Sequence, residues 1–569
     1  MLSTIQTNDF TGGLNYRADA FQLAENESPD LLNVDLDPRG GFSQRAGVTD
    51  YNTSAIGSLG SAAFTPKRAF FWEGNNRQLL VAANDKVFWT QNGTFADTGA
   101  VTTAADGAQF APWSSSATSL LYSSAGAGTA GFKWDGSTLT TLTASATSAW
   151  QDSFASPTGT HMPTADHVAT HVDRLWVAST SEDGSLFPDR VRYSHPGFPE
   201  SWRELDYIDV VGGGRGITGI VSFGDQLLVF KPRAVFAILG YDEDTYQLVP
   251  LTTQVGAASP KAIAVSETGV FFFSWPDGLF VYDGQTFTDL FGQLRPIVEL
   301  GEFADEAADD VLVSRVGRRV LVSLPAGVAP SAYTYNSTED TYRSATLVYG
   351  GQTQGYEQAG VTYDSAAVKF DGDVQTSVVT QTFVWDPTIG DGGSWTRYQL
   401  GDGYGFGPST DFVTNAGDRV PVTAHPAKPY VLKVDQTDLY RDTVAGTAFD
   451  ISSYYVTRWQ DAGVMTASKF WRRPELMVRQ LGEDTSLTVQ VFHDWNRATV
   501  DRSFTVALAG EDIAGGYSSW VQPDLGADLV KGSNLGLAKA VQLKVSGAGG
   551  QPWGVNAIAY KFNPRRSRV

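Results

Sequence analysis

The stretch from Gly269 to Gly284, GVFFFSWPDGLFVYDG, constrains the fold more than any other part of the chain. Two short apolar runs, Val270–Phe273 and Leu279–Tyr282, are joined by the turn residues Trp275–Gly278 and followed by Asp283-Gly284, a strong hairpin signal. Strands joined so tightly must be antiparallel, and an antiparallel hairpin with one face in water should alternate apolar and polar residues. Neither run alternates cleanly, so both faces of the hairpin must be covered. Small sheets packed face to face, such as the blades of a β-propeller, satisfy this requirement.

The same arrangement recurs along the chain. An apolar run precedes an Asn-Gly or Asp-Gly pair at three places, Val87–Trp89 before Asn92, Phe132–Trp134 before Asp135, and Leu279–Tyr282 before Asp283. The first two pairs lie 43 residues apart and the last two 148, which leaves room for three units of the 40–50 residues expected for blades. Two further units in this gap keep the apolar pattern without the Asp-Gly pair, in the segments 174–194 and 226–238. We therefore expect an all-β chain with a six- or seven-bladed β-propeller.

Composition supports this class and excludes others. The 569 residues include 59 glycines and 12% aromatic residues, as expected for many strands and turns. Cysteine is absent, which excludes disulfides and thiolate metal sites. There is neither a long apolar run nor a signal-peptide pattern, so we expect a soluble protein with no membrane-spanning segment and no export signal. The net charge of −21, from 41 basic and 62 acidic residues, makes the whole surface a poor sequence-independent binder of nucleic acid.

The sequence divides into three parts. Residues 1–54 form an N-terminal arm, in which Ser28 and Pro29 predict a helical turn over Asp30–Leu32, followed by strands at 33–36 and 42–45. Residues 55–450 form the propeller. Its strand at 319–324 finds its partner hairpin only at 381–400, which predicts an inserted β segment at about 327–380 with strands at 332–335 and 368–370. Residues 451–569 form a C-terminal β-sandwich, because segments such as 486–491 and 541–545 alternate.

Motifs that often mark binding sites lack the context they need. Gly214–Gly219 matches G-x-G-x-x-G, but a short strand follows it rather than the helix that dinucleotide binding requires. His167 and His171 are four apart, yet they run into an apparent strand and no H-E-x-x-H motif exists. The acidic clusters at 35–37 and 242–244 lack the ligand spacing of a calcium loop. We therefore predict no cofactor, no metal site and no catalytic residues.

Local basic clusters stand out in this acidic chain. They are Trp471-Arg472-Arg473 near the start of the sandwich and Arg565, Arg566 and Arg568 at its end, and we add Arg45 of the arm to them. One interpretation is a solvated surface and tail. The other is docking onto an acidic partner or a neighbouring copy, because arginine and tryptophan are enriched in interface cores. These seven residues are the candidate interface.

Several segments resemble bacteriophage tail proteins. Phe10–Asn15, Asn26–Asn33 and Gly41–Gly47 with Arg45 resemble the opening of the tail nozzle family of short-tailed phages, also called tail tubular protein B. The segments 173–178 and 217–231 are similar to the propeller of tail hub proteins. Trp471–Pro474, Gly554–Ile558 and the arginines after them resemble the ends of such minor tail proteins. Residues 327–380 have no counterpart in this resemblance.

The resemblance implies a non-enzymatic virion component that is assembled in the bacterial cytoplasm as a homo-oligomeric ring. Six copies are typical of the nozzle family, and three are the alternative. Each subunit would contribute a propeller, neighbouring tail proteins would bind the ring, and double-stranded DNA would pass through its lumen. The family supplies no catalytic residues. The acidic surplus suits such a conduit, because a wall of like charge repels the phosphates and does not grip the duplex.

Two alternatives of other classes stay open. A receptor-binding propeller would hold a host-surface glycan against exposed aromatic residues such as Trp113, Trp150 or Trp202. A glycan-cleaving propeller enzyme would use two of the 62 acidic residues as its carboxylate pair.

Overall fold

The computed structural model describes most of the chain. The described residues are 3–19, 22–57, 64–74, 76–103, 106–115, 118–142, 161–299, 305–325, 346–349, 352–355, 379–436, 440–479, 485–508, 518–521, 535–547 and 550–564. Strands dominate them. The helical elements are the one-turn α1 (Pro296–Glu299) and two 3-10 turns, η2 (Pro260–Ala262) and η3 (Asp305–Asp310). In this part of the chain no helix has the length and apolar character needed to cross a bilayer.

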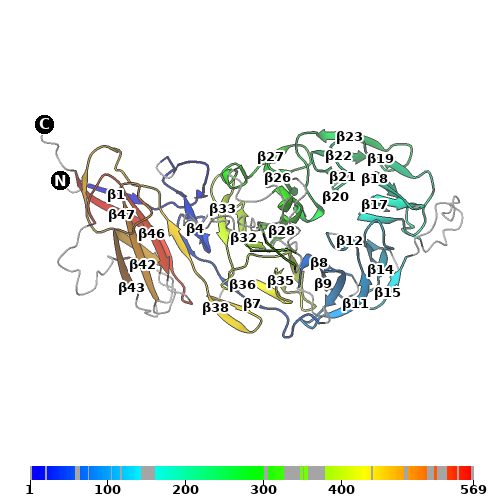
Figure 1. Ribbon diagram of the computed structural model, residues 1–569, viewed down its shortest axis with the longest axis horizontal. Coiled ribbons are helices and arrows are strands. Elements are labelled where there is room, and N and C mark those ends of the chain that lie inside the picture. Colours follow the sequence, from blue (N-terminus) through cyan, green and yellow to red (C-terminus); the bar gives the residue numbers. More distant parts are fainter. Residues whose placement is uncertain are drawn as a thin grey trace.

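Seven four-stranded antiparallel sheets form a β-propeller, so the predicted fold class is confirmed and the blade count is seven (Figure 1). In blades 1 to 5 the strands pair in chain order from the inside outward. Blade 1 consists of β8 (Pro66–Trp72), β9 (Gln78–Ala83), β10 (Lys86–Thr90) and β11 (Ala96–Val101), and blade 2 of β12 (Gln109–Ser114), β13 (Ser119–Ser124), β14 (Phe132–Trp134) and β15 (Leu139–Thr141). Blade 3 consists of β16 (Thr164–His171), β17 (Arg174–Glu182), β18 (Ser185–Tyr193) and β19 (Tyr207–Asp209), and blade 4 of β20 (Gly219–Phe223), β21 (Gln226–Lys231), β22 (Ala234–Leu239) and β23 (Gln247–Thr252). Blade 5 consists of β24 (Ile263–Val265), β25 (Val270–Ser274), β26 (Gly278–Tyr282) and β27 (Phe287–Asp289).

The hairpin of β25 and β26 shows why its strands do not alternate. Phe272 faces blade 4, with its ring 5.3 Å from that of Phe230. The next residue inward along the strand, Phe271, faces blade 6, with its ring 5.8 Å from that of Trp385. Both faces of a blade are thus covered by its neighbours, and a continuous apolar run results. The Asn-Gly and Asp-Gly pairs seen in the sequence follow the third strands of blades 1, 2 and 5.

Blade 6 contains the insertion. It consists of β28 (Leu312–Val316), β29 (Arg319–Pro325), β32 (Val379–Asp386) and β33 (Ser394–Tyr398). β29 pairs with β32 from Val320 opposite Trp385 to Leu324 opposite Gln381, which confirms the predicted delayed pairing. The inserted part includes the hairpin β30 (Thr346–Tyr349) and β31 (Gln352–Gly355). The strands expected at 332–335 and 368–370 lie outside the described residues.

The N-terminus closes the ring. Blade 7 consists of β34 (Ser409–Val413), β35 (Arg419–Ala424), β36 (Val431–Gln436) and, as its outermost strand, β7 (Gly47–Asp50). β7 pairs with β36, with Thr49 opposite Lys433, and the inner strands β34 and β8 contact each other. The predicted propeller, residues 55–450, leaves out this strand. The prediction is wrong on that point, because the last blade has only three strands of its own and residues 47–50 supply the fourth.

The C-terminal part is a sandwich of two sheets, and the arm belongs to both. One sheet contains β1 (Ser3–Thr7), β5 (Val34–Leu36), β6 (Phe42–Gln44), β40 (Lys469–Trp471), β41 (Glu475–Arg479), β44 (Ser518–Val521), β45 (Gly536–Ala538) and β47 (Gly554–Pro564). The other has the order β4 (Asp30–Leu32), β39 (Tyr454–Val456), β46 (Val541–Gly547), β42 (Thr485–His493) and β43 (Arg502–Leu508). Short pairs complete the fold, β2 (Gly13–Leu14) with β3 (Glu27–Ser28) and β37 (Arg441–Val444) with β38 (Thr447–Asp450).

The predicted helical turn at Asp30–Leu32 is wrong. These residues form β4, which pairs with β39, so that Leu31 lies opposite Tyr455. A helical turn of three residues gains little by itself, whereas a strand here gains ladder hydrogen bonds and buries Leu31 completely. Tertiary pairing therefore overrides the local capping signal.

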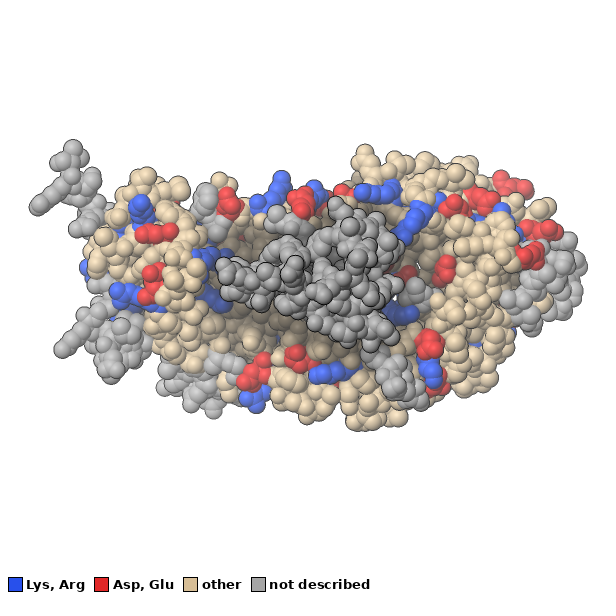
Figure 2. Space-filling model, viewed as in Figure 1, with Lys and Arg blue, Asp and Glu red and all other residues tan. Residues whose placement is uncertain are grey.

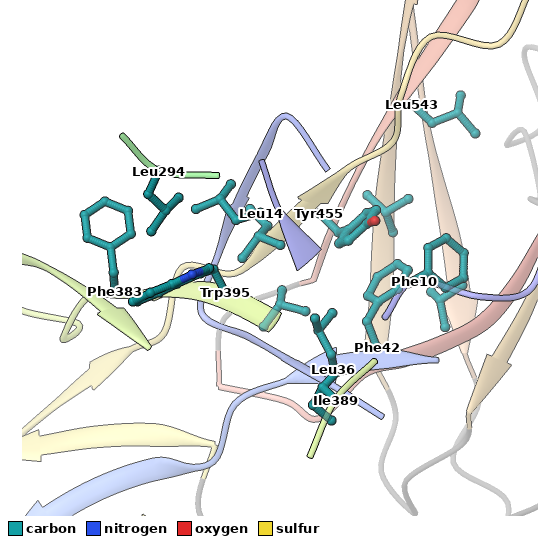
Figure 3. Close-up of a cluster of buried hydrophobic side chains, with 14 of the residues drawn as sticks. Phe10, Leu14, Leu36, Phe42, Leu294, Phe383, Ile389, Trp395, Tyr455 and Leu543 are labelled. Atoms are coloured by element: carbon teal, nitrogen blue, oxygen red, sulfur yellow. The ribbon is translucent and has the colours of Figure 1, made fainter. Parts of the chain in front are cut away.

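A continuous apolar core joins the propeller to the sandwich (Figure 3). Phe42 of the arm stacks on Tyr455 of the sandwich with ring centroids 4.3 Å apart, and Phe10 meets Phe42 edge-on at 4.8 Å. On the propeller side, Trp395 of β33 packs edge-on against Phe291 at 5.6 Å. The two parts are one packed body with the arm between them.

Candidate functional site

Arg45 lies inside the molecule at the junction of arm, propeller and sandwich. Its Nη2 lies 2.5 Å from Asp442 Oδ2 and its Nη1 3.0 Å from Oδ1, with both side chains almost completely buried. Nε donates to Asn33 Oδ1, and the remaining donors reach the carbonyls of Ala46 and Gln399. All five N–H groups of the guanidinium are thereby used. Burial opposes its charge, but Asp442 outweighs this effect and raises the pKa of Arg45 above its usual value.

Asp442 completes this junction from the other side. Besides the guanidinium, its carboxylate accepts hydrogen bonds from the backbone N–H groups of Val48 and Gly401. Val48 belongs to the strand that closes the propeller, so a single carboxylate ties that strand to the β37–β38 hairpin leading to the sandwich. The expectation that Arg45 is a docking residue is wrong, because a side chain only 2% exposed cannot meet a partner.

The Trp471-Arg472-Arg473 cluster divides between core and surface. Trp471 in β40 is fully buried, its indole N–H donates to the Ala538 carbonyl at 3.0 Å, and its ring lies 5.1 Å from that of Phe562. Arg472 is exposed and Arg473 is half-buried. Trp471 is therefore a core residue, and Arg472 and Arg473 remain surface candidates. Arg565, Arg566 and Arg568 lie outside the described residues.

Side chains link the starts of the inner strands of several blades at one side of the ring. Arg68 of blade 1 donates through Nη2 to the carbonyl of Pro260, at the entry to blade 5, at 3.1 Å. Lys261 Nζ lies 3.0 Å from Asp106 Oδ1 and 3.0 Å from Asp310 Oδ1, at the entries to blades 2 and 6. Burial lowers the pKa of Arg68, whereas the two carboxylates outweigh burial and raise that of Lys261. The contacts of Arg68 with Pro260 and of Lys261 with Asp106 join blades on opposite sides of the ring, and the contact of Lys261 with Asp310 joins neighbouring blades.

The two neighbouring histidines hold blade 3 to the blades beside it. His167 accepts at Nδ1 from the Gln109 side chain at 2.8 Å and donates from Nε2 to the Ile217 carbonyl at 2.9 Å, since a carbonyl can only accept. His171 Nδ1 lies 2.8 Å from Ser222 Oγ. Burial lowers the pKa of both histidines. Among the described residues, no group of three or more His, Asp or Glu side chains is arranged to hold a metal ion.

The glycine-rich motif and the acidic clusters also occupy structural positions. Gly214–Gly219 lies in the loop between β19 and β20, and β20 begins at Gly219, as the predicted strand requires. Asp35 accepts from the Tyr398 hydroxyl and lies 3.2 Å from Arg319, whose pKa it raises. Glu243 pairs with Arg174 and Arg203.

Two of the three aromatic residues proposed as a glycan platform are not at the surface. Trp113 is 6% exposed and Trp202 is 2% exposed, and both belong to the core between blades 2 and 3. Trp150 lies outside the described residues. The stacking surface expected from Trp113 and Trp202 is therefore absent.

Charge is distributed unevenly along the molecule. Residues 1–450 contain 27 basic and 52 acidic residues, a net charge of −25, whereas residues 451–569 contain 14 and 10, a net charge of +4. Figure 2 shows Asp and Glu side chains gathered at the end of the propeller far from the sandwich, on the right of the view. Every blade also carries an exposed carboxylate on the loops that join its first to its second strand or its third to its fourth, namely Glu73, Asp135, Asp173, Asp225, Glu267, Asp391 and Asp418. These loops share one side of the ring, which we call the acidic face.

Comparison with known proteins does not assign this chain to a family. The sequence matches no protein-family model and no curated protein. Similar solved structures include BBS1N in complex with ARL6DN, at 10% identity over 69% of this chain and 98% of that chain, with a TM-score of 0.37. An ancestral GH74 enzyme is 8% identical over 70% of this chain and 54% of its own, also at 0.37. The extracellular domain of BT4673 from B. thetaiotaomicron is 9% identical over 84% of this chain, which spans about half (47%) of that one, at 0.32. Similarity this low carries no argument about function.

Proposed function

We propose that this chain is a non-enzymatic structural protein of a bacteriophage particle. It would be a tail nozzle, hub or minor tail component that assembles in several copies around the DNA conduit and offers a platform to adsorption proteins.

The observation that carries this proposal is the position of the residues behind the family resemblance. Asn15, Ser28, Asn33 and Arg45 all come from the resembling segments of the arm, and all four are buried. The Asn15 N–H donates to the Ser28 carbonyl at 3.0 Å, and Asn33 accepts from Arg45. The resembling residues therefore lie in the buried framework that joins the propeller to the sandwich. Proteins that share this architecture would need to keep that framework.

Two further features agree with a conduit built between copies. Arg68 and Lys261 join blades on opposite sides of the ring, so a duplex would have to pass between subunits and not along a propeller axis. An acidic face presented to that passage would repel phosphates and let the duplex slide. The receptor-binding alternative loses support, because Trp113 and Trp202, two of its three platform residues, are buried.

Labelling of virus particles tests the proposal. Antibodies raised against the purified chain should decorate the tails of particles released by the strain that encodes it, and particles made without the chain should fail to retain or deliver DNA. Absence of the chain from purified particles would contradict the proposal. Binding of the isolated chain to host polysaccharide, or its turnover of that polysaccharide, would favour the two alternatives.

A further inference from the structure

Exposed apolar side chains gather at two places on the surface. Among the described residues, 13 large apolar side chains are exposed, and 11 of them fall into two groups. The first group, which we call the rim patch, consists of Leu186, Phe198, Leu205, Tyr207, Val211 and Tyr241. The second, which we call the sandwich patch, consists of Val464, Met465, Phe470, Val500 and Leu537. Grouped apolar exposure of this kind marks protein–protein contact sites.

The rim patch follows the outer edge of blade 3. Leu205 is 81% exposed and Val211 78%, and they flank β19, which is the free edge strand of its sheet. Arg190 lies between the rings of Phe187 and Tyr207, 4.2 and 3.8 Å from their centroids, so the start of β18 and β19 are in contact.

A short ionic bridge extends this patch to blade 4. Arg203 pairs with Glu243, which brings the loop that carries Leu205 beside the turn that carries Tyr241. The patch therefore spans two blades.

The sandwich patch is built around the short edge strand β45. Leu537 lies directly opposite Phe470 across the β40–β45 pair, and they are 48% and 37% exposed. Lys469 Nζ donates to the carbonyls of Val464 and Lys539, which holds the loop of Val464 and Met465 beside β45.

The hairpin that carries Val500 is attached to Lys539, the residue that follows β45. Asp494, at the start of this hairpin, accepts from the backbone N–H of Lys539. Pro564 lies opposite Lys469 across the β40–β47 pair, and Arg565, Arg566 and Arg568 follow Pro564 closely in sequence.

The two patches are complementary in charge. Residues 173–246, which contain the rim patch, include 12 acidic and 7 basic residues, and Asp183, Glu204, Asp209, Asp242 and Asp244 are exposed there. Four of the seven basic residues are largely covered, since the side chains of Arg174, Arg190, Arg192 and Arg203 are 3, 13, 2 and 20% exposed. Arg215 and Arg233 are exposed, so the accessible charge here remains mainly acidic. Around the sandwich patch, the basic residues Arg472, Arg497, Arg502 and Lys539 are exposed together with the acidic residues Asp494 and Asp501, so basic residues outnumber acidic ones there.

We propose that the rim patch of one copy docks on the sandwich patch of the next copy. The partner is a second copy of this chain, because both patches have an apolar centre, their surrounding charges are opposite, and they lie at opposite ends of the long axis (Figure 1). The contact joins two different surfaces, and repetition of such a contact builds a closed ring or an open filament rather than a two-fold dimer. The inference deepens the proposed function by naming the surfaces between copies.

Charge reversal tests the contact. Mass photometry and light scattering of the purified full-length chain should detect species larger than the monomer that dissociate as salt is raised. Arg472→Glu with Lys539→Glu, or Glu204→Lys with Asp244→Lys, should weaken association at least about tenfold. Glu267→Lys with Glu73→Lys, which lie outside both patches, should leave association unchanged, and so should Val265→Ser, whereas Val211→Ser should weaken it.

A mixing experiment separates this contact from any symmetric one. The sandwich variant and the rim variant should each fail alone but associate when mixed, because each then meets a complementary surface on the other, and the chain with all four substitutions should associate by itself. A wild-type chain that stays monomeric at high concentration and low salt overturns the proposal, as does a mixture that does not associate. Detection of the chain in phage tails without this contact would overturn this inference alone and leave the proposed function standing.

Discussion

Arg45 and Asp442 meet in the interior of the protein although 396 residues separate them in sequence, with Nη2 2.5 Å from Oδ2. This pair joins the arm to the segment that leads from the propeller into the sandwich. Both groups are fully hydrogen-bonded, which is the condition under which a buried ion pair is tolerated.

Asp442→Ala should destabilise the fold by about 3–5 kcal/mol, because it leaves the buried guanidinium of Arg45 without a counter-charge. The double variant Arg45→Met with Asp442→Leu should cost less than the single one, since no buried charge remains. Urea unfolding followed by tryptophan fluorescence measures both. The matched control is Arg39→Ala, which breaks the ion pair of an arginine that is 82% exposed and should leave the free energy of unfolding almost unchanged.

Phe42→Ala should cost about 3–5 kcal/mol, because Phe42 contacts Phe10, Tyr455 and Trp553 in the core between arm and sandwich. Its effect should appear as a lower thermal midpoint of the whole protein. Phe470→Ala is the control, since that ring is 37% exposed, and it should shift the midpoint by little. Equal shifts for the two variants would contradict the packing described for the junction.

Replacement of residues 326–378 by a two-residue Asn-Gly turn should leave the propeller folded. Leu324 and Gln381 are paired across β29 and β32, so the strand ends are already adjacent and a tight turn can join them. Removing a long connection also lowers the entropic cost of closing the hairpin. Circular dichroism and thermal unfolding should give a spectrum and a midpoint close to those of the full chain. Loss of the folded state would mean that the insertion supports blade 6.

Acidification from pH 7.5 to 5.5 should lower the urea midpoint. Burial lowers the pKa of His167 and of His171, so the folded protein binds fewer protons than the unfolded chain. The stability they contribute is complete above about pH 6.5, the usual histidine value, and is lost as the pH falls through the folded-state pKa. Carboxylates with a lowered pKa, such as Asp402, lose their contribution only below about pH 4, the usual aspartate pKa, and fall outside this window. His171→Leu should reduce the pH dependence, and a midpoint that rises on acidification would contradict the prediction.

The sequence predicted those parts of the fold that local patterns determine. The continuous apolar run Val270–Phe273 predicted a hairpin covered on both faces, and the structure confirms it because consecutive side chains face two neighbouring blades. The delayed pairing of 319–324 with 381–386 was also visible, since an apolar strand needs a partner of its own kind. The closure of blade 7 by Gly47–Asp50 could not be predicted, because a four-residue strand carries no local signal that its partner is Val431–Gln436.

The candidate site was less accessible from the sequence. Arg45 looked like a surface cation, and nothing local marks Asp442 as its partner among 62 acidic residues. Strand alternation would have separated Trp471 from Arg472, since neighbouring side chains point to opposite faces of a sheet. The rim patch gave no signal at all, because Leu205 and Val211 resemble core residues until the fold exposes them.

Electron cryo-microscopy of virus particles released by the strain that encodes this chain tests the proposed assembly most directly. The account predicts several copies of the seven-bladed propeller in a closed ring around the tail axis, with blade 3 of each copy against the sandwich of the next and the DNA path between them. Particles without this density, or a single copy attached off the axis, would contradict it.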